Sequence, residues 1–77
     1  MSEIHPAPGE FTEDQLSADP ILRYFHYAHL PPFLQSVSKQ FFLTAQFIVE
    51  TCPRNPERTV ALRKLLEAKD AAVRSNV

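Results

Sequence analysis

The chain has 77 residues, of which 44% are hydrophobic and 22% are charged, a composition typical of one small globular domain. Eight Lys and Arg residues against nine Asp and Glu give a formal net charge of -1, which argues against a general DNA-binding protein because such proteins carry a basic excess. The single cysteine excludes an internal disulfide, and no apolar run reaches the ~18 residues that a membrane-spanning helix needs.

Glycine and proline divide the chain into a tail and two long stretches without helix breakers. The only glycine is Gly9, so tight hairpin turns between strands have no glycine to use after that position. No proline falls between Pro32 and Pro53 or after Pro56. The sequence therefore predicts an all-α fold, in which a short N-terminal helix is followed by an antiparallel two-helix hairpin.

Residues 1–17 are predicted to form an arm that is flexible or docks extended on a neighbour, and residues 18–77 to form the helical hairpin domain. Two prolines, Gly9 and few apolar side chains favour this interpretation of the arm. The alternative is a one-turn helix in its second half, because Thr12 and Gln15 have the spacing of a capping box.

A short amphipathic helix is predicted after Asp19, which suits an N-cap and precedes a proline at the first helical position. The apolar residues at i, i+3, i+4 and i+7 are Ile21, Tyr24, Phe25 and Ala28. On this pattern Tyr24 is a core residue, and Tyr27, which lies off the apolar face, is exposed.

The second helix is predicted to begin at Pro32 and to stop before Pro53. Phe42 and Val49 widen its apolar stripe, which consists of Leu34, Val37, Phe41, Ala45, Ile48 and Cys52. Its place on the stripe indicates that Cys52 is a small buried hydrophobe rather than a reactive thiol.

The last helix is predicted to start at Pro56, with Asn55 as its N-cap. Its first apolar row is Ala61, Leu65, Ala68 and Ala72. Lys69 interrupts the second row, which is Leu62, Leu66, Lys69 and Val73. Ion pairs at helical spacing are expected on another face, among Arg63, Glu67, Asp70 and Arg74.

The chain carries more apolar surface than one hairpin and one short helix can bury. It has six phenylalanines, and Leu43 and Phe47 point away from the stripe of the second helix. A second copy of the chain is the simplest cover for this surface, so a homo-oligomer is expected. The alternative is a monomer in which the first helix and the arm cover it.

Neither a catalytic set nor a metal-ligand spacing is present, and one glycine cannot build a phosphate loop. We therefore expect no enzyme, no metal and no cofactor. The densest chemistry is the run RYFHYAHLP at 23–31, whose rings are of the kind that stack on nucleobases. Tyr27 is the exposed ring on the helical pattern, and His26 is a further candidate ligand residue.

Isolated cations are the candidates for binding an anion such as phosphate. Lys39 is the only charged residue between Arg23 and Glu50, so it is either free for an anion or a solubilising side chain on a solvent face. Weaker candidates on the last helix are Arg63, Lys69 and Arg74.

The segment from Leu22 to Arg74, about two-thirds of the chain, resembles a known family. The matching residues are RYFHYAHLP at 23–31, AQFI at 45–48, Cys52-Pro53, Glu57-Arg58 and ALRKLLEA at 61–68. The family comprises phage-encoded cyclic-oligonucleotide sponges that counter CBASS immunity and share a helical hairpin domain with sponges of Thoeris signals.

The resemblance implies a helical protein that assembles as a hexamer and sequesters cyclic dinucleotides and cyclic trinucleotides without cleaving them, in pockets between protomers. It implies an aromatic residue that stacks on a base and a lysine that meets a phosphate; Tyr27 and Lys39 match these roles, with Tyr24 as the alternative ring. Arg74 matches an arginine that serves a second pocket type. The implied location is the cytoplasm of the infected bacterial host, without DNA or membrane partners.

Four other hypotheses remain. A helical adaptor would bind another protein through the Phe-rich face, and a sponge for cyclic ADP-ribose-type Thoeris signals would use the same fold. A DNA-binding helix-turn-helix is disfavoured because Glu67 and Asp70 interrupt the basic face of the last helix. An enzyme would have to use His26 or His29 as its general base.

Overall fold

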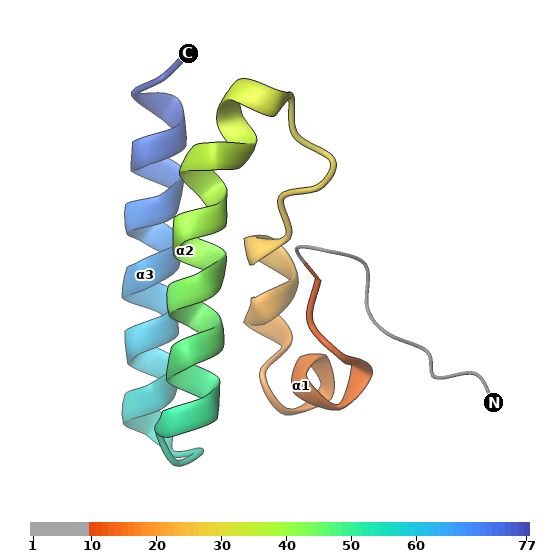
Figure 1. Cartoon of the computed structure of the whole chain (residues 1–77). Helices are drawn as coiled ribbons and strands as arrows, with labels where there is room; N and C mark the ends of the chain where they lie inside the picture. The colour runs from red at the N-terminus through yellow and green to blue at the C-terminus, as the bar shows by residue number, and fades with distance from the viewer. Residues whose placement is uncertain (1–9) are drawn as a thin grey trace, which may run out of the picture.

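The computed structural model describes residues 10–77, and every regular element in that range is helical. The elements in chain order are α1 (Glu13–Ala18), the 3-10 helix η1 (Pro20–Phe25), α2 (Pro32–Thr51) and α3 (Pro56–Arg74). Figure 1 shows α2 and α3 side by side as an antiparallel hairpin, and η1 contacts both of them. The all-α class and the two-helix hairpin are confirmed. None of the helices within residues 10–77 is long and apolar enough to cross a membrane.

The ends of the two long helices lie where the prolines predicted them. α2 begins with Pro32 at its first position and ends at Thr51, two residues before Pro53. α3 begins with Pro56, and the side chain of its N-cap Asn55 accepts the backbone N–H of Arg58 at 3.0 Å. These local signals fix the hairpin because proline and an Asn cap each favour one helical position.

The second half of the predicted arm forms a helix that packs on the rest of the domain. The backbone N–H of Gln15 donates to the Thr12 hydroxyl at 3.2 Å, and the Thr12 N–H donates to the Gln15 side chain at 2.9 Å. This is the capping box of the alternative interpretation. Phe11 is buried in the core and Leu16 packs against it. The first half of the arm, residues 1–9, lies outside the described residues.

The segment after Asp19 is a 3-10 helix rather than an α-helix, and this corrects the assignment of its two tyrosines. A 3-10 helix repeats every three residues, so Leu22 and Phe25 share the inward side and are fully buried. Tyr24 points outward and is 57% exposed, whereas Tyr27 is only 9% exposed. Because η1 ends at Phe25, the chain turns and directs Tyr27 inward, against the ring of Phe42 at 5.5 Å.

The inward face of α2 is rotated relative to the predicted stripe. Its buried residues are Leu34, Ser38, Phe42 and Ala45. The rotation follows from the packing of Phe42, whose ring contacts Phe11 at 4.6 Å as well as Tyr27. The predicted burial of Cys52 is wrong: the helix ends before it, its backbone is extended, and its side chain is exposed.

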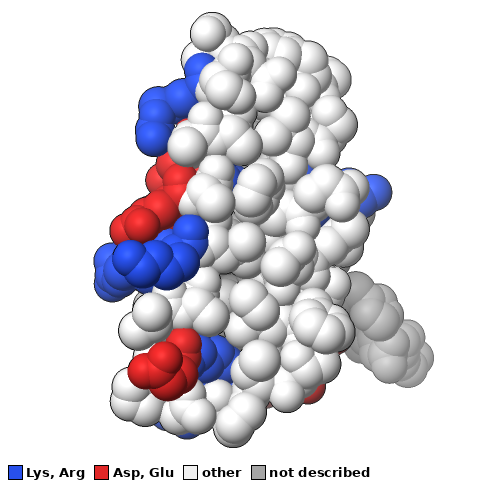
Figure 2. All heavy atoms as spheres, turned by 90° about the vertical axis from the view of Figure 1, so that its left-hand side faces the viewer, with Lys and Arg blue, Asp and Glu red and all other residues white. Residues whose placement is uncertain are grey.

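Part of the apolar surface lies outside the core, as predicted for Leu43 and Phe47. Leu43 is 42% exposed, Phe47 is 62% exposed, and Val60 of α3 is 47% exposed. Figure 2 shows the charged side chains gathered along one edge of the face that α3 presents, beside a broad uncharged area. We call these exposed apolar residues of α2 and α3 (Leu43, Phe47 and Val60) the apolar face, and the predicted oligomer stays a prediction.

Candidate functional site

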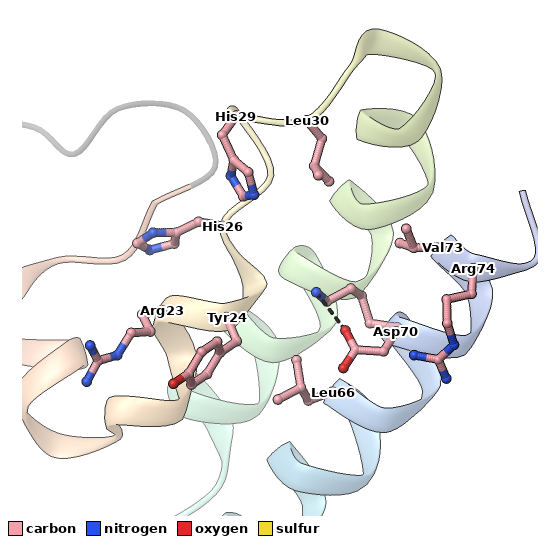
Figure 3. Close-up of a pocket in the computed structure, with 10 residues that line it drawn as sticks. Arg23, Tyr24, His26, His29, Leu30, Leu66, Asp70, Val73 and Arg74 are labelled. Carbon is pink, nitrogen blue, oxygen red and sulfur yellow. Dashed lines mark ion pairs between the residues drawn. The ribbon is translucent and has the colours of Figure 1, made fainter. Parts of the chain in front are cut away.

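A pocket with a volume of about 370 Å³ lies between η1, the loop that follows it, and the C-terminal half of α3. Figure 3 shows its residues coming from two walls that face each other, with α3 as one wall. The η1 wall contributes Arg23 and Tyr24, and the loop contributes His26 and His29. Side chains that are spread over residues 23–74 of the sequence therefore meet at one surface.

The 3-10 geometry of η1 presents two neighbouring side chains to the pocket. Leu22 and Phe25 anchor the element in the core, which leaves Arg23 and Tyr24 on the outer side. The guanidinium of Arg23 lies 5.7 Å from the centroid of the Tyr24 ring, within the range of a cation–π contact. The pair offers an exposed aromatic face beside a positive charge.

The loop after η1 is held by the first turns of α2. The side-chain amide of Gln35 donates to the carbonyl oxygens of Ala28 at 3.2 Å and Leu30 at 2.8 Å. These two bonds flank His29 and satisfy backbone acceptors that follow the end of η1. Gln35 thereby fixes the path of the loop that carries the pocket's histidines.

The α3 wall combines an apolar floor with charged groups. Leu66 and Val73 line the pocket between the charged residues. The side chain of Lys69 is only 14% exposed, and its Nζ lies 3.0 Å from Oδ1 of Asp70. Arg74 in the last turn of α3 completes this wall. Lys69 thus follows the inward row that it was predicted to interrupt, and its ammonium is held in the pocket.

The ion pairs expected along the outer face of α3 do not form within residues 10–77. Asp70 pairs with its neighbour Lys69 rather than with Arg74, and Arg63 makes no ion pair with Glu67. The reason is the position of Asp70, which lines the pocket and is turned toward Lys69. Arg74 therefore has no ion pair within residues 10–77 and can bind another anion.

The pocket collects four of the seven candidate ligand residues and leaves out three. Those that line it are Tyr24, His26, Lys69 and Arg74. Tyr27 is buried, while Lys39 and Arg63 are exposed and lie outside the pocket.

Three polar residues of the pocket, Arg23, His29 and Asp70, were not among the seven candidate ligand residues, although His29 was considered as a general base. The proximity of Arg23 and His29 to Tyr24 and His26 in the chain is the signal that could have found the first two. Nothing in the sequence indicated that Asp70 belongs to the same site.

The arrangement suits a flat anionic ligand. An exposed ring is available for stacking, and three permanent cations, Arg23, Lys69 and Arg74, outnumber the one carboxylate of Asp70. Guanidinium and ammonium groups are strong donors to phosphate oxygens. Within residues 10–77, no three His, Cys, Asp or Glu side chains gather into a group that could hold a metal ion.

Comparisons with known proteins add no relative to this geometry. No protein-family model, curated protein or solved structure matches the chain.

Proposed function

We propose that this protein sequesters cyclic oligonucleotide second messengers, both cyclic dinucleotides and cyclic trinucleotides, without cleaving them, and so antagonises CBASS signalling in the cytoplasm of an infected bacterium. The observation that carries the proposal is the pocket in which the exposed ring of Tyr24 lies among Arg23, Lys69 and Arg74. The resemblance of residues 22–74 to cyclic-oligonucleotide sponges supports the same ligand class.

The two kinds of group in the pocket match the two parts of such a ligand. A nucleobase stacked on an aromatic side chain contributes about 1–3 kcal/mol. A hydrogen bond between phosphate and a charged donor contributes about 1.5–3 kcal/mol. Tyr24 is 57% exposed and so can be covered by a base, while Lys69 and Arg74 face the same cavity from α3.

The size of the pocket favours a site that extends beyond one chain. Its volume of about 370 Å³ lies near the lower end of the range of about 300–1,000 Å³ for small-molecule sites, whereas a cyclic dinucleotide carries two bases and two phosphates. We propose that a second copy covers the rest of the ligand in a homo-oligomer, for which the resemblance implies a hexamer. Lys39 is exposed and has no ion pair within residues 10–77, so it is the cation that a second copy offers.

The proposal assigns sequestration rather than turnover to this pocket. The pocket groups best suited to act as a general base are two histidines and a carboxylate already paired with Lys69. We assign none of these three groups the role of a general base, because we identify no nucleophilic side chain beside them in the pocket. The ligand is then expected to leave chemically unchanged.

A panel binding experiment tests the proposal. The purified protein is titrated by calorimetry with cyclic dinucleotides, cyclic trinucleotides and cyclic ADP-ribose, and each complex is then heat-denatured and the released ligand is chromatographed. We expect saturable binding of at least one cyclic dinucleotide or trinucleotide and full recovery of the intact compound. Binding of cyclic ADP-ribose alone would indicate that the protein sequesters Thoeris signals instead. Recovery of a linear product would show that the protein is an enzyme.

A second candidate function, a helical adaptor, is favoured by the apolar face. Leu43, Phe47 and Val60 are exposed apolar side chains of α2 and α3, and exposed apolar patches mark protein interaction sites. Binding to another protein would leave the pocket without a ligand. The calorimetric panel separates the two, because an adaptor binds none of the nucleotides.

A further inference from the structure

His26 belongs both to the pocket and to the packing of the N-terminal segment. It lines the pocket, and in Figure 3 its ring lies on the side away from α3. The backbone N–H of Phe11 donates to Nε2 of His26 at 3.3 Å, and the two rings stack with centroids 6.1 Å apart. The imidazole of His26 therefore lines the pocket and also contacts Phe11.

Phe11 is the residue that fastens the segment before α1 to the core. It is 4% exposed and its ring centroid lies 4.6 Å from that of Phe42. α1 itself contributes no fully buried residue; Leu16 packs partly against the core, and Arg54 donates to the carbonyl oxygen of Ala18 at 3.1 Å, so Phe11 supplies the one fully buried apolar anchor of residues 10–18. A weaker hold on Phe11 therefore loosens residues 10–18 more than it loosens the hairpin.

The bond between Phe11 and His26 exists in only one protonation state of the ring. Nε2 can accept the Phe11 N–H while it carries no proton of its own. A proton on Nε2 turns it into a donor that faces another donor, and the bond is lost.

The charges around His26 connect this protonation to the pocket. Arg23 comes from η1, His29 from the same loop, and Lys69, Asp70 and Arg74 from α3. On the N-terminal side, the acidic neighbour of Phe11 is the exposed Glu10. The net charge of the pocket groups is positive, so the pocket attracts an anion, and a bound anion brings negative charge that favours the imidazolium.

We propose that His26 is a latch operated by protons and by anions. With Nε2 unprotonated, it holds Phe11 and α1 on the core; as the imidazolium, formed at lower pH or when an anion occupies the pocket, it releases them. The response to an anion (the anion half of the proposal) rests on the proposed function, whereas the response to protons (the proton half) does not. Because coupling between two sites is reciprocal, release of the segment also tightens the binding of the anion.

Nuclear magnetic resonance of the full chain tests the latch. The amide shift of Phe11 and the contact between the Phe11 and Phe42 rings are followed from about pH 8 to about pH 5, the range in which histidine titrates. We expect the ratio of released to held segment to rise about tenfold, which corresponds to about 1.4 kcal/mol. At constant pH near neutrality, inorganic pyrophosphate is expected to shift the ratio in the same direction.

Two matched variants assign the response to one ring. In His26→Gln the side-chain oxygen occupies nearly the position of Nε2 and still accepts the Phe11 N–H, but it cannot be protonated in this range, so we expect the segment to stay held. His29→Gln removes the other histidine of the pocket and is expected to respond like the parent. An equal acid response in His26→Gln, or its loss in His29→Gln, overturns the latch.

The pyrophosphate measurement separates the two halves of the proposal. A response to acid without a response to pyrophosphate overturns the coupling to the pocket and supports the proton half. A failure of cyclic nucleotides to bind would overturn the proposed function but would leave the acid response of Phe11 as expected. The two failures are therefore distinguishable.

Discussion

The guanidinium of Arg58, in the first turn of α3, forms a buried ion pair with the carboxylate of Asp19, 39 residues earlier in the chain. The same guanidinium donates to the carbonyl oxygens of Cys52 at 2.8 Å and Val49 at 3.4 Å. Arg58 thus joins the start of α3 to the start of η1 and to the C-terminal end of α2. Asp19 occupies the N-cap position of η1, but its side chain makes no capping bond and serves Arg58 instead.

Removal of Asp19 is expected to destabilise the domain strongly. The two side chains are 6% and 8% exposed, and loss of one partner of a buried pair costs about 3–5 kcal/mol because the other charge stays buried. Asp19→Ala should therefore lower the free energy of unfolding by about 3 kcal/mol or more in urea titrations followed by circular dichroism. Arg63→Gln, at an exposed position outside any ion pair within residues 10–77, is the control. A loss below about 1 kcal/mol, the size of a surface pair, would contradict the assigned role.

Substitution on the apolar face is expected to prevent assembly. Phe47 is 62% exposed in one chain, and a carboxylate placed there would have to be buried unpaired in an oligomer. Phe47→Glu should therefore change a multimer into a monomer in light scattering while the helical content stays constant. Lys64→Glu, at an exposed position of α3, is expected to leave the multimer intact. A monomeric parent protein would contradict the oligomer itself.

The hairpin could be predicted from the sequence because its signals are local. Prolines at the first positions of α2 and α3, the Asn55 cap and the helical spacing of apolar residues act within a few residues of chain. The capping box of α1 is local as well, and it was visible as the alternative interpretation of the arm.

The pairing of Arg58 with Asp19 and the place of Asp70 in the pocket could not be predicted in the same way. Both depend on how segments far apart in the chain come together.

The tyrosine assignment failed for a physical reason that concerns the helical period. With 3.6 residues per turn, Tyr24 falls on the face of Ile21 and Phe25; with three residues per turn, it falls a third of a turn away from Leu22 and Phe25. Six residues are too few for periodicity to distinguish the two helices. The same change of period separates the two candidate rings, because Tyr24 lines the pocket whereas Tyr27, which follows the end of η1, is buried.

The two tyrosines are expected to respond differently to truncation. Tyr24 is exposed and lines the pocket, so Tyr24→Ala should weaken cyclic dinucleotide binding about tenfold through the lost stack and leave the melting temperature nearly unchanged. Tyr27 is buried against Phe42, and Tyr27→Ala should cost about 3 kcal/mol of stability through lost packing. Calorimetry and thermal melts on both variants give the comparison. A stable Tyr27→Ala protein that no longer binds would make Tyr27 the stacking ring.

Substitution of Lys69 tests the phosphate contact within one chain. Its ammonium is mostly buried and faces the pocket beside Asp70. Lys69→Gln removes a charged donor to phosphate, which is worth about 1.5–3 kcal/mol, and should therefore weaken cyclic dinucleotide binding at least tenfold in calorimetry. Asp70→Asn removes the competing carboxylate and is expected to strengthen binding. Unchanged affinity in Lys69→Gln would place the phosphate elsewhere.

Substitution of Lys39 tests whether the site extends to a second copy. Lys39 is exposed on α2 and lies outside the pocket of its own chain. If a second copy completes the site, Lys39→Gln should weaken binding about tenfold, the cost of one charged hydrogen bond, and the loss should appear only under conditions in which the parent is multimeric. Adding Lys39→Gln to monomeric Phe47→Glu should then change nothing further, because the two copies no longer meet. Equal affinity of Lys39→Gln and the parent multimer would confine the ligand to the pocket between η1 and α3.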